Sequence, residues 1–241
     1  MDEQNYQIVL SPDLGISPEE FARAWNDYSH SNLSPEARQL LLCLAPFTSV
    51  IWLEMLDNYT EQLRQQPTLA SLPFERWPDV LREVQNRGLL SPDPAIPAFL
   101  RLQPIFPYFL RNRLQEPAQA EVKQAVERAF REHYQRLGFS LDSLLTSQDG
   151  QERQAGQLLA GLEYENLVTA LTLALAAETS IAGYYNALLR YLVDKQEPHR
   201  GLALFQVILD RFEGYQAEKL TGPLGVEFAS ILGSKIGRAH V

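Results

Sequence analysis

The apolar positions of this chain recur mostly three and four residues apart, which is the spacing of one face of an α-helix. Three such segments follow one another in the first half of the sequence. The first begins at Pro35, behind a serine cap, and ends at Pro46. The second is expected to start after Ser49 and to carry Trp52 on its apolar face. The third ends at Gly88, because glycine readily adopts the left-handed conformation that closes a helix.

A short β-hairpin is expected after the third helix. Leu89 and Leu90 predict its first strand, and residues 99–102 predict the strand that returns. The loop between them contains Asp93 and several prolines, which are typical turn residues. Three helices followed by a hairpin are the order of elements in a winged helix. We therefore expect a winged-helix domain over residues 33–116, with the hairpin as its wing.

The rest of the chain predicts helices only. One amphipathic helix is expected to end at Gly138, and a second, long helix is expected to end at about Glu178. A hairpin of two helices should follow over 181–194 and 198–212. The predicted fold class is therefore mainly α, a winged-helix domain followed by a helical-hairpin repeat domain over residues 117–241.

Both ends of the chain add expectations. Residues 1–32 predict a separate small unit, a half-buried strand followed by a helix that starts near Ser17. Residues 222–241 stop within a helical pattern, which indicates a repeat array whose next helix pair is missing. Because such an end leaves apolar surface uncovered, we expect the region near Ile231 and Leu232 to favour self-association.

Composition narrows the classes of function. The chain has 241 residues and a net charge of -9, which opposes non-specific attraction to nucleic acid or to an anionic membrane. No apolar run reaches the roughly 20 residues that span a bilayer, and the acidic start is unlike a signal peptide. We therefore expect a cytoplasmic protein without membrane contact. The single cysteine, Cys43, excludes a disulfide within the chain and is expected to be buried.

No motif indicates catalysis. The sequence has no glycine-rich phosphate loop, no paired zinc ligands and no nucleophile motif, and none of its four histidines has a partner at metal-binding spacing. Glu163 and Glu165 are two residues apart on a predicted helix, so they cannot act together as acid and base. We expect no catalytic residue, no cofactor and no metal. Residues far apart in sequence remain the alternative route to catalysis.

Two motifs resemble the STAND class of signal-transducing NTPases. Residues 88–90 with 99–104 resemble the "GLL, then RLHPL" ending of the winged helix in that class. Residues 162–171 resemble the "E, then NL, then AL" helix that follows it. The later hairpin is similar in spacing to a tetratricopeptide repeat. The residues that carry this last resemblance are Leu188, Leu189, Leu192, Gly201, Phe205 and Ile208.

The resemblance implies a regulatory module that corresponds to the segment after the ATPase domain in that class. The phosphate loop of the ATPase domain is absent from this sequence. In that class a winged-helix histidine can sense the nucleotide. Gln103 fills this position and cannot carry charge, which puts nucleotide sensing in doubt. The implied partner is another protein or another domain of a larger assembly. Tyr184, Tyr185 and Tyr191 are the candidate anchors, since tyrosine combines a large contact area with a polar tip. Packing between repeat helices is the alternative for each of them.

The alternative function is a winged-helix transcriptional regulator that binds DNA. Arg82 and Arg87 on the predicted recognition helix, with Arg101 beside the wing, would then contact phosphates and bases. Residues 74–87 contain three arginines and three acids, however, so the predicted recognition helix has no net charge. We therefore expect these arginines to pair with neighbouring acids, and DNA to be bound only weakly.

Overall fold

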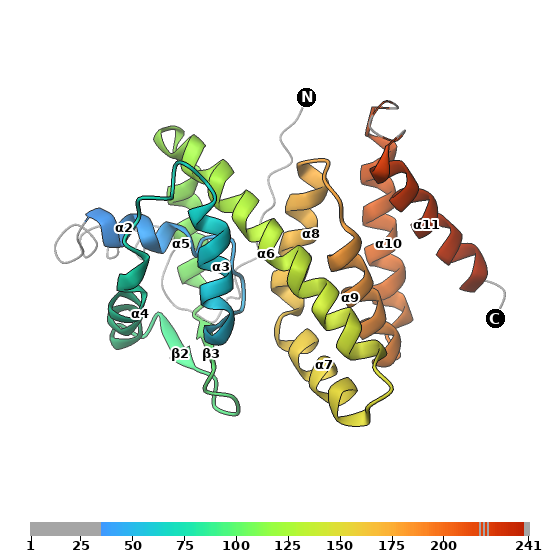
Figure 1. The fold of residues 1–241 in the computed structure, drawn as a ribbon, viewed down its shortest axis with the longest axis horizontal. Coiled ribbons are helices and arrows are strands. Elements are labelled where there is room, and N and C mark those ends of the chain that lie inside the picture. Colours follow the sequence, from blue (N-terminus) through green and yellow to red (C-terminus); the bar gives the residue numbers. More distant parts are fainter. Residues whose placement is uncertain (1–34, 217, 219, 221, 239–241) are drawn as a thin grey trace.

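The computed structural model describes residues 35–216, 218, 220 and 222–238, which form two parts (Figure 1). The first part contains α2 (Pro35–Leu42), β1 (Val50–Trp52), α3 (Leu56–Arg64), α4 (Trp77–Asn86), β2 (Leu90–Pro92), β3 (Phe99–Leu102) and α5 (Ile105–Leu114). The second part contains α6 (Ala120–Thr146), α7 (Gly150–Leu162), α8 (Tyr164–Ala176), α9 (Ala182–Asp194), α10 (Pro198–Glu213) and α11 (Pro223–Arg238). Short 3₁₀ turns occupy Leu53–Met55, Phe74–Arg76 and Pro117–Gln119. The molecule is mainly helical, as the sequence pattern predicts. The strand and helix expected in residues 1–32 lie outside the described residues.

The strands form an antiparallel sheet in the order β1-β3-β2. The hairpin of β2 and β3 was expected, but β1 was not. The sequence pattern placed Trp52 on a helix, and this prediction is wrong, because Trp52 pairs with Phe99 in the sheet and the two rings stack with centroids 5.2 Å apart. The helix α3 therefore starts only at Leu56.

The third predicted helix matches α4 closely. Its proline, Pro78, lies in the first turn, where a missing backbone N–H costs nothing. Gly88 has a φ of 74°, so it closes the helix in the expected left-handed conformation. Cys43 is fully buried, as predicted, and its backbone oxygen accepts a hydrogen bond of 2.6 Å from the hydroxyl of Tyr59.

The helix α6 continues through Gly138 to Thr146, so the prediction that Gly138 ends this helix is wrong. Gly138 instead lies where α6 crosses α9. A Cβ atom on Gly138 would stand 2.4 Å from the carbonyl oxygen of Gly183, and one on Gly183 would stand 2.3 Å from that of Gln135. The two glycines therefore let the backbones approach, because any larger residue would push the helices apart.

The single long helix expected to reach Glu178 is also wrong. It is broken at Glu163 into α7 and α8, which are bent by 67° relative to each other. The helical spacing of the sequence places Leu158 on the inward face of that single helix, but on α7 it is 53% exposed. The next predicted hairpin is confirmed as α9 and α10.

The helix α11 packs back onto the hairpin rather than ending the array as an open edge. Phe228 stacks on Phe212 with ring centroids 4.7 Å apart, and Ile231 is only 4% exposed. Leu232 is half-buried against the same core. The expected uncovered end near Ile231 and Leu232 is therefore wrong.

One hydrophobic core extends through both parts, from Leu40 in α2 to Ile231 in α11. The helix α6 provides the continuity, because it packs against α3 at one side and against α8 and α9 at the other (Figure 1). Phe130 on α6, for example, lies 5.1 Å from the ring of Phe47 in the first part.

Candidate functional site

The predicted recognition helix α4 carries arginines that are already paired with acids, as expected from the sequence. Arg82 lies 3.2 Å from Asp79, and Arg87 lies 2.6 Å from Glu83. A phosphate contact by either arginine would compete with a carboxylate of the same helix. This arrangement weakens the case for a DNA-binding surface on α4.

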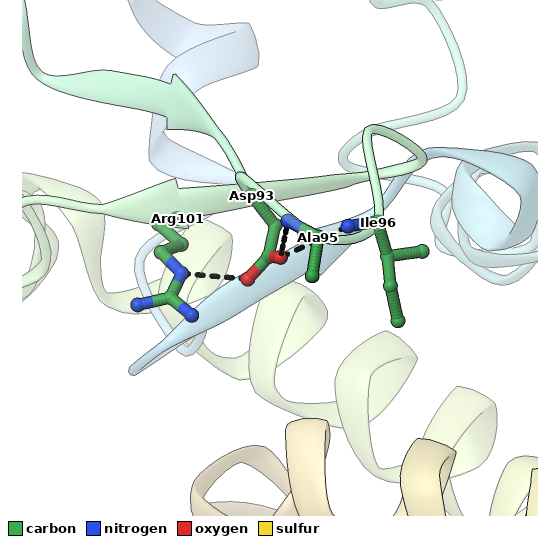
Figure 2. Close-up of polar contacts among 4 residues, drawn as sticks. All are labelled: Asp93, Ala95, Ile96 and Arg101. Atoms are coloured by element: carbon green, nitrogen blue, oxygen red, sulfur yellow. Dashed lines mark hydrogen bonds and ion pairs between the residues drawn. The ribbon is translucent and has the colours of Figure 1, made fainter.

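The third arginine of that alternative, Arg101, is held by the wing loop (Figure 2). One carboxylate oxygen of Asp93 accepts hydrogen bonds from the backbone N–H groups of Ala95 (2.8 Å) and Ile96 (3.0 Å). The other oxygen accepts a bond of 2.6 Å from Nε of Arg101. Asp93 is only 2% exposed. The hydrogen bond from Arg101 lowers its pKa most, and the bonds from the backbone N–H groups lower it further. The Asp93 and Arg101 pair therefore fixes the loop between β2 and β3.

Gln103, at the position of the nucleotide-sensing histidine, is exposed between β3 and α5. Its backbone N–H donates to the oxygen of Leu89, and its carbonyl accepts from Phe106 at the start of α5. The backbone of Gln103 thus joins the wing to the next helix.

Two of the three candidate tyrosine anchors are buried, which favours the alternative of packing between helices. Tyr184 is 2% exposed and donates a hydrogen bond of 2.7 Å to the backbone oxygen of Arg131 on α6. Tyr185 is 5% exposed and lines a groove between α6, α9 and α11. Tyr191 is half-buried, and its ring lies 5.8 Å from that of Tyr164. It alone of the three remains available at the surface.

The two parts of the molecule meet at a cluster of polar groups, which we call the joint. It consists of backbone groups of Thr48 and Val50 and the buried side chains of Tyr134, Glu163 and Asn166. Asn166 is at its centre and is fully buried. Its amide oxygen accepts from the backbone N–H of Thr48 at 2.8 Å, and its NH₂ group donates to the oxygen of Val50 at 2.9 Å. The same NH₂ group donates to Glu163 Oε2 at 2.7 Å, and the hydroxyl of Tyr134 donates to that oxygen at 2.8 Å. One side chain of α8 thus satisfies backbone groups at and just before β1.

Arg111 from α5 supports the joint from outside. Its guanidinium donates to the backbone oxygens of Ala45 (3.1 Å) and Pro46 (3.3 Å) and to the hydroxyl of Thr48 (2.9 Å). The Thr48 hydroxyl also lies 2.7 Å from that of Thr169 on α8. The charge of Arg111 is thus directed at carbonyl oxygens that follow α2.

The joint contains a carboxyl group without a cationic partner. Glu163 is 1% exposed, and none of the ion pairs between described residues involves it. Burial raises the pKa of Glu163 to about 7, although the hydrogen bonds from Asn166 and Tyr134 act in the opposite direction. Burial also raises the pKa of Tyr134 far above its usual value. A neutral carboxylic acid is therefore close in free energy to the carboxylate at this position.

Glu163 and Asn166 belong to the motif in residues 162–171, but the motif alone does not predict that they lie at an interface. The spacing of these residues does indicate a buried position. Glu163, Asn166 and Ala170 are spaced three and four residues apart, so both polar residues share the apolar face of α8 with a buried alanine. Polar side chains on a core-facing position need buried partners. Those of Asn166 include Thr48 and Val50 of the first part. Those of Glu163 are Tyr134 and Asn166, which belong to the second part.

An open groove of about 470 Å³ lies between α6, α9 and α11. Asp142 and Arg190 line it, with 4.0 Å between a carboxylate oxygen and Nε. In the part of the chain that the structure describes, no group of three histidine, cysteine, aspartate or glutamate side chains could hold a metal ion. Within these ranges no single helix is long and apolar enough to cross a membrane, and α7 and α8 pass that test only as a bent pair.

Comparisons of this chain with protein-family models, with curated proteins and with solved structures each found no match.

Proposed function

We propose that this chain is a non-catalytic regulatory and protein-interaction module of the cytoplasm, similar to the segment that follows the ATPase in STAND signalling proteins. Residues 33–116 act as its winged-helix part, and residues 117–241 act as its helical, tetratricopeptide-like part. The partner is another protein or another domain of the same assembly.

The order of elements supports the winged-helix assignment. Three helices, α2, α3 and α4, precede the hairpin of β2 and β3, and the short strand β1 between the first two helices pairs with β3 at the edge of the hairpin. Such a unit can read DNA or can serve as a docking element. The paired arginines of α4 favour docking.

The observation that carries the proposal is the joint. Two residues of the STAND-like motif lie there: Asn166 binds the backbone at Thr48 and Val50 in the first part, and Glu163 accepts a hydrogen bond from Asn166. Because these contacts fix one part against the other, binding of a partner to either part would also affect the other part. That property suits a regulatory segment, and it requires no catalytic group.

The helical part offers apolar surface for a partner. Most of the exposed large apolar side chains among the described residues belong to it: Phe139, Leu158, Val193, Leu202, Val207 and Val226. Leu202 and Val207 are each 59% exposed, and both lie on α10. We therefore assign the contact to α10, in place of the buried tyrosines.

The test compares the wild type with a Leu202→Glu and Val207→Glu double variant. Leu53→Glu, at an exposed apolar residue of the first part, is the control. We expect the wild type to self-associate in sedimentation velocity or to capture a specific protein from source lysate, and we expect the double variant alone to lose the interaction. A monomeric wild type that captures nothing beyond an unrelated bait contradicts the proposal.

Two binding measurements separate the competing functions. Calorimetry should show no ATP binding of micromolar affinity, because the sequence has no phosphate loop. Fluorescence anisotropy with mixed duplexes should show no affinity tighter than the non-specific range of about 10⁻⁴ to 10⁻⁶ M. Nanomolar binding of one DNA sequence, lost in Arg82→Ala and Arg87→Ala, would support the transcriptional regulator instead.

A further inference from the structure

Glu163 occupies an unusual place for an acidic residue. It lies at the bend between α7 and α8, inside the joint, with both hydrogen-bond donors to Oε2 coming from side chains that are themselves buried. An ionised carboxylate there is removed from water, and none of the described residues forms an ion pair with it. A protonated carboxyl does not suffer this penalty and keeps an oxygen that accepts from Tyr134 and Asn166.

The other titratable groups around Glu163 do not change charge near neutral pH. Tyr134 on α6 and Tyr59 on α3 both have pKa values raised well above 10 by burial. His133, whose ring lies 5.0 Å from that of Tyr134, is buried and has its pKa lowered to about 4, so it stays neutral. Arg111, which reaches the joint through Thr48, stays charged.

We propose that Glu163 controls a proton-dependent latch between the two parts of the molecule. The latch acts through Asn166, which binds both Glu163 and the first part, and it is closed when the carboxyl of Glu163 is protonated and loosened when this carboxyl ionises. Ionisation leaves a buried negative charge at the joint, and the bonds from Asn166 to Thr48 and Val50 open together with it. The latch belongs to the chain itself and does not require the partner proposed above.

The direction of the effect follows from the pKa. Because the pKa of Glu163 is raised from 4.5 to about 7 in the folded protein, the folded state binds the extra proton between these values. The contribution of the protonated carboxyl is fully present below about pH 4.5, and it is lost as the pH rises through 7. The hydrogen bonds of the joint are thus more stable in mildly acidic solution than above neutral pH.

The first experiment is a ¹³C NMR titration of glutamate carboxyl carbons in the full chain. We expect one resonance with a midpoint near pH 7, and we expect it to be absent in Glu163→Gln. A wild-type protein in which every glutamate titrates below about pH 5 overturns the proposal.

The second experiment measures amide hydrogen exchange of Thr48, whose N–H binds Asn166. After correction for intrinsic exchange, its protection should fall about tenfold between pH 6 and pH 8, since the ionised fraction rises accordingly. Glu163→Gln should abolish this dependence. The control amide is Asp93, which donates to Phe99 in the wing and should not respond. A fall of equal size in the variant or at Asp93 overturns the proposal.

Tyr134→Phe tests the same latch without changing the carboxyl, and it remains informative if Glu163→Gln does not fold. Removing the hydroxyl deletes one donor to the carboxylate, so the titration midpoint of Glu163 should move to higher pH. An unchanged or lower midpoint contradicts the assignment.

Discussion

At the scale of single residues, the wing shows how one carboxylate can organise a loop. The prolines of this loop cannot donate backbone hydrogen bonds, so few backbone groups are available to fix it. Asp93 fixes the loop instead, because its carboxylate accepts hydrogen bonds from two backbone N–H groups and from Arg101 at the same time (Figure 2). The same arrangement keeps Arg101 from acting as a free cation beside the wing.

We predict that Asp93→Ala lowers the urea midpoint of unfolding more than Asp93→Asn does. The amide oxygen of asparagine still accepts from Ala95 and Ile96, whereas alanine accepts nothing. Because the pKa of Asp93 is lowered on folding, its stabilising effect is present above its unfolded pKa and is lost as the pH falls through the folded pKa. Urea titrations at neutral and acidic pH measure both effects.

The matched control is Asp79→Asn. Asp79 pairs with Arg82 on the exposed face of α4, where an ion pair contributes little. We expect its unfolding midpoint to stay at the wild-type value. If Asp93→Asn were as destabilising as Asp93→Ala, the ion pair rather than the backbone acceptor would be the important contact.

At the scale of elements, the crossing of α6 and α9 depends on two glycines. Gly138→Ala should destabilise the protein by about 1 to 3 kcal/mol or more, because the new methyl group meets the backbone of Gly183 and not a side chain that could move. Gly150→Ala is the control, since nothing lies within 4 Å of its Cβ position at the start of α7. Alanine there should be neutral or slightly stabilising. Thermal unfolding followed by circular dichroism gives both values, and equal effects at the two sites would contradict the crossing.

The elements also show what the sequence pattern can and cannot predict. Local signals were sufficient for α4, which has a proline in its first turn and Gly88 after its end, and for the hairpin of α9 and α10. They were insufficient where contacts with residues far away in the sequence determine the local structure. Trp52 joins a strand because Phe99 lies opposite it, and Gly138 stays helical because α9 crosses there. The break at Glu163 has only Gly161, two residues earlier, as a local signal, and it coincides with hydrogen bonds from Tyr134 and Asn166 in the joint.

At the scale of the whole molecule, the continuous core implies that both parts unfold together. Two of the three tryptophans, Trp52 and Trp77, belong to the first part, so their fluorescence reports on it, and Trp25 lies outside the described residues. Far-ultraviolet circular dichroism reports mainly on the long helices from α6 onward. We predict that both signals change at the same urea concentration in the wild type, which is the signature of a two-state transition.

Asn166→Ala should separate the two transitions. The substitution leaves the N–H of Thr48 and the oxygen of Val50 without their buried partner, at a cost of roughly 2 to 4 kcal/mol. Because those groups belong to the first part, the fluorescence transition should move to lower urea than the circular dichroism transition. Thr172→Ala, an exposed substitution on the same helix, should leave the signals coincident. If Asn166→Ala lowered both midpoints equally, the core around α6 and not the joint would hold the two parts together.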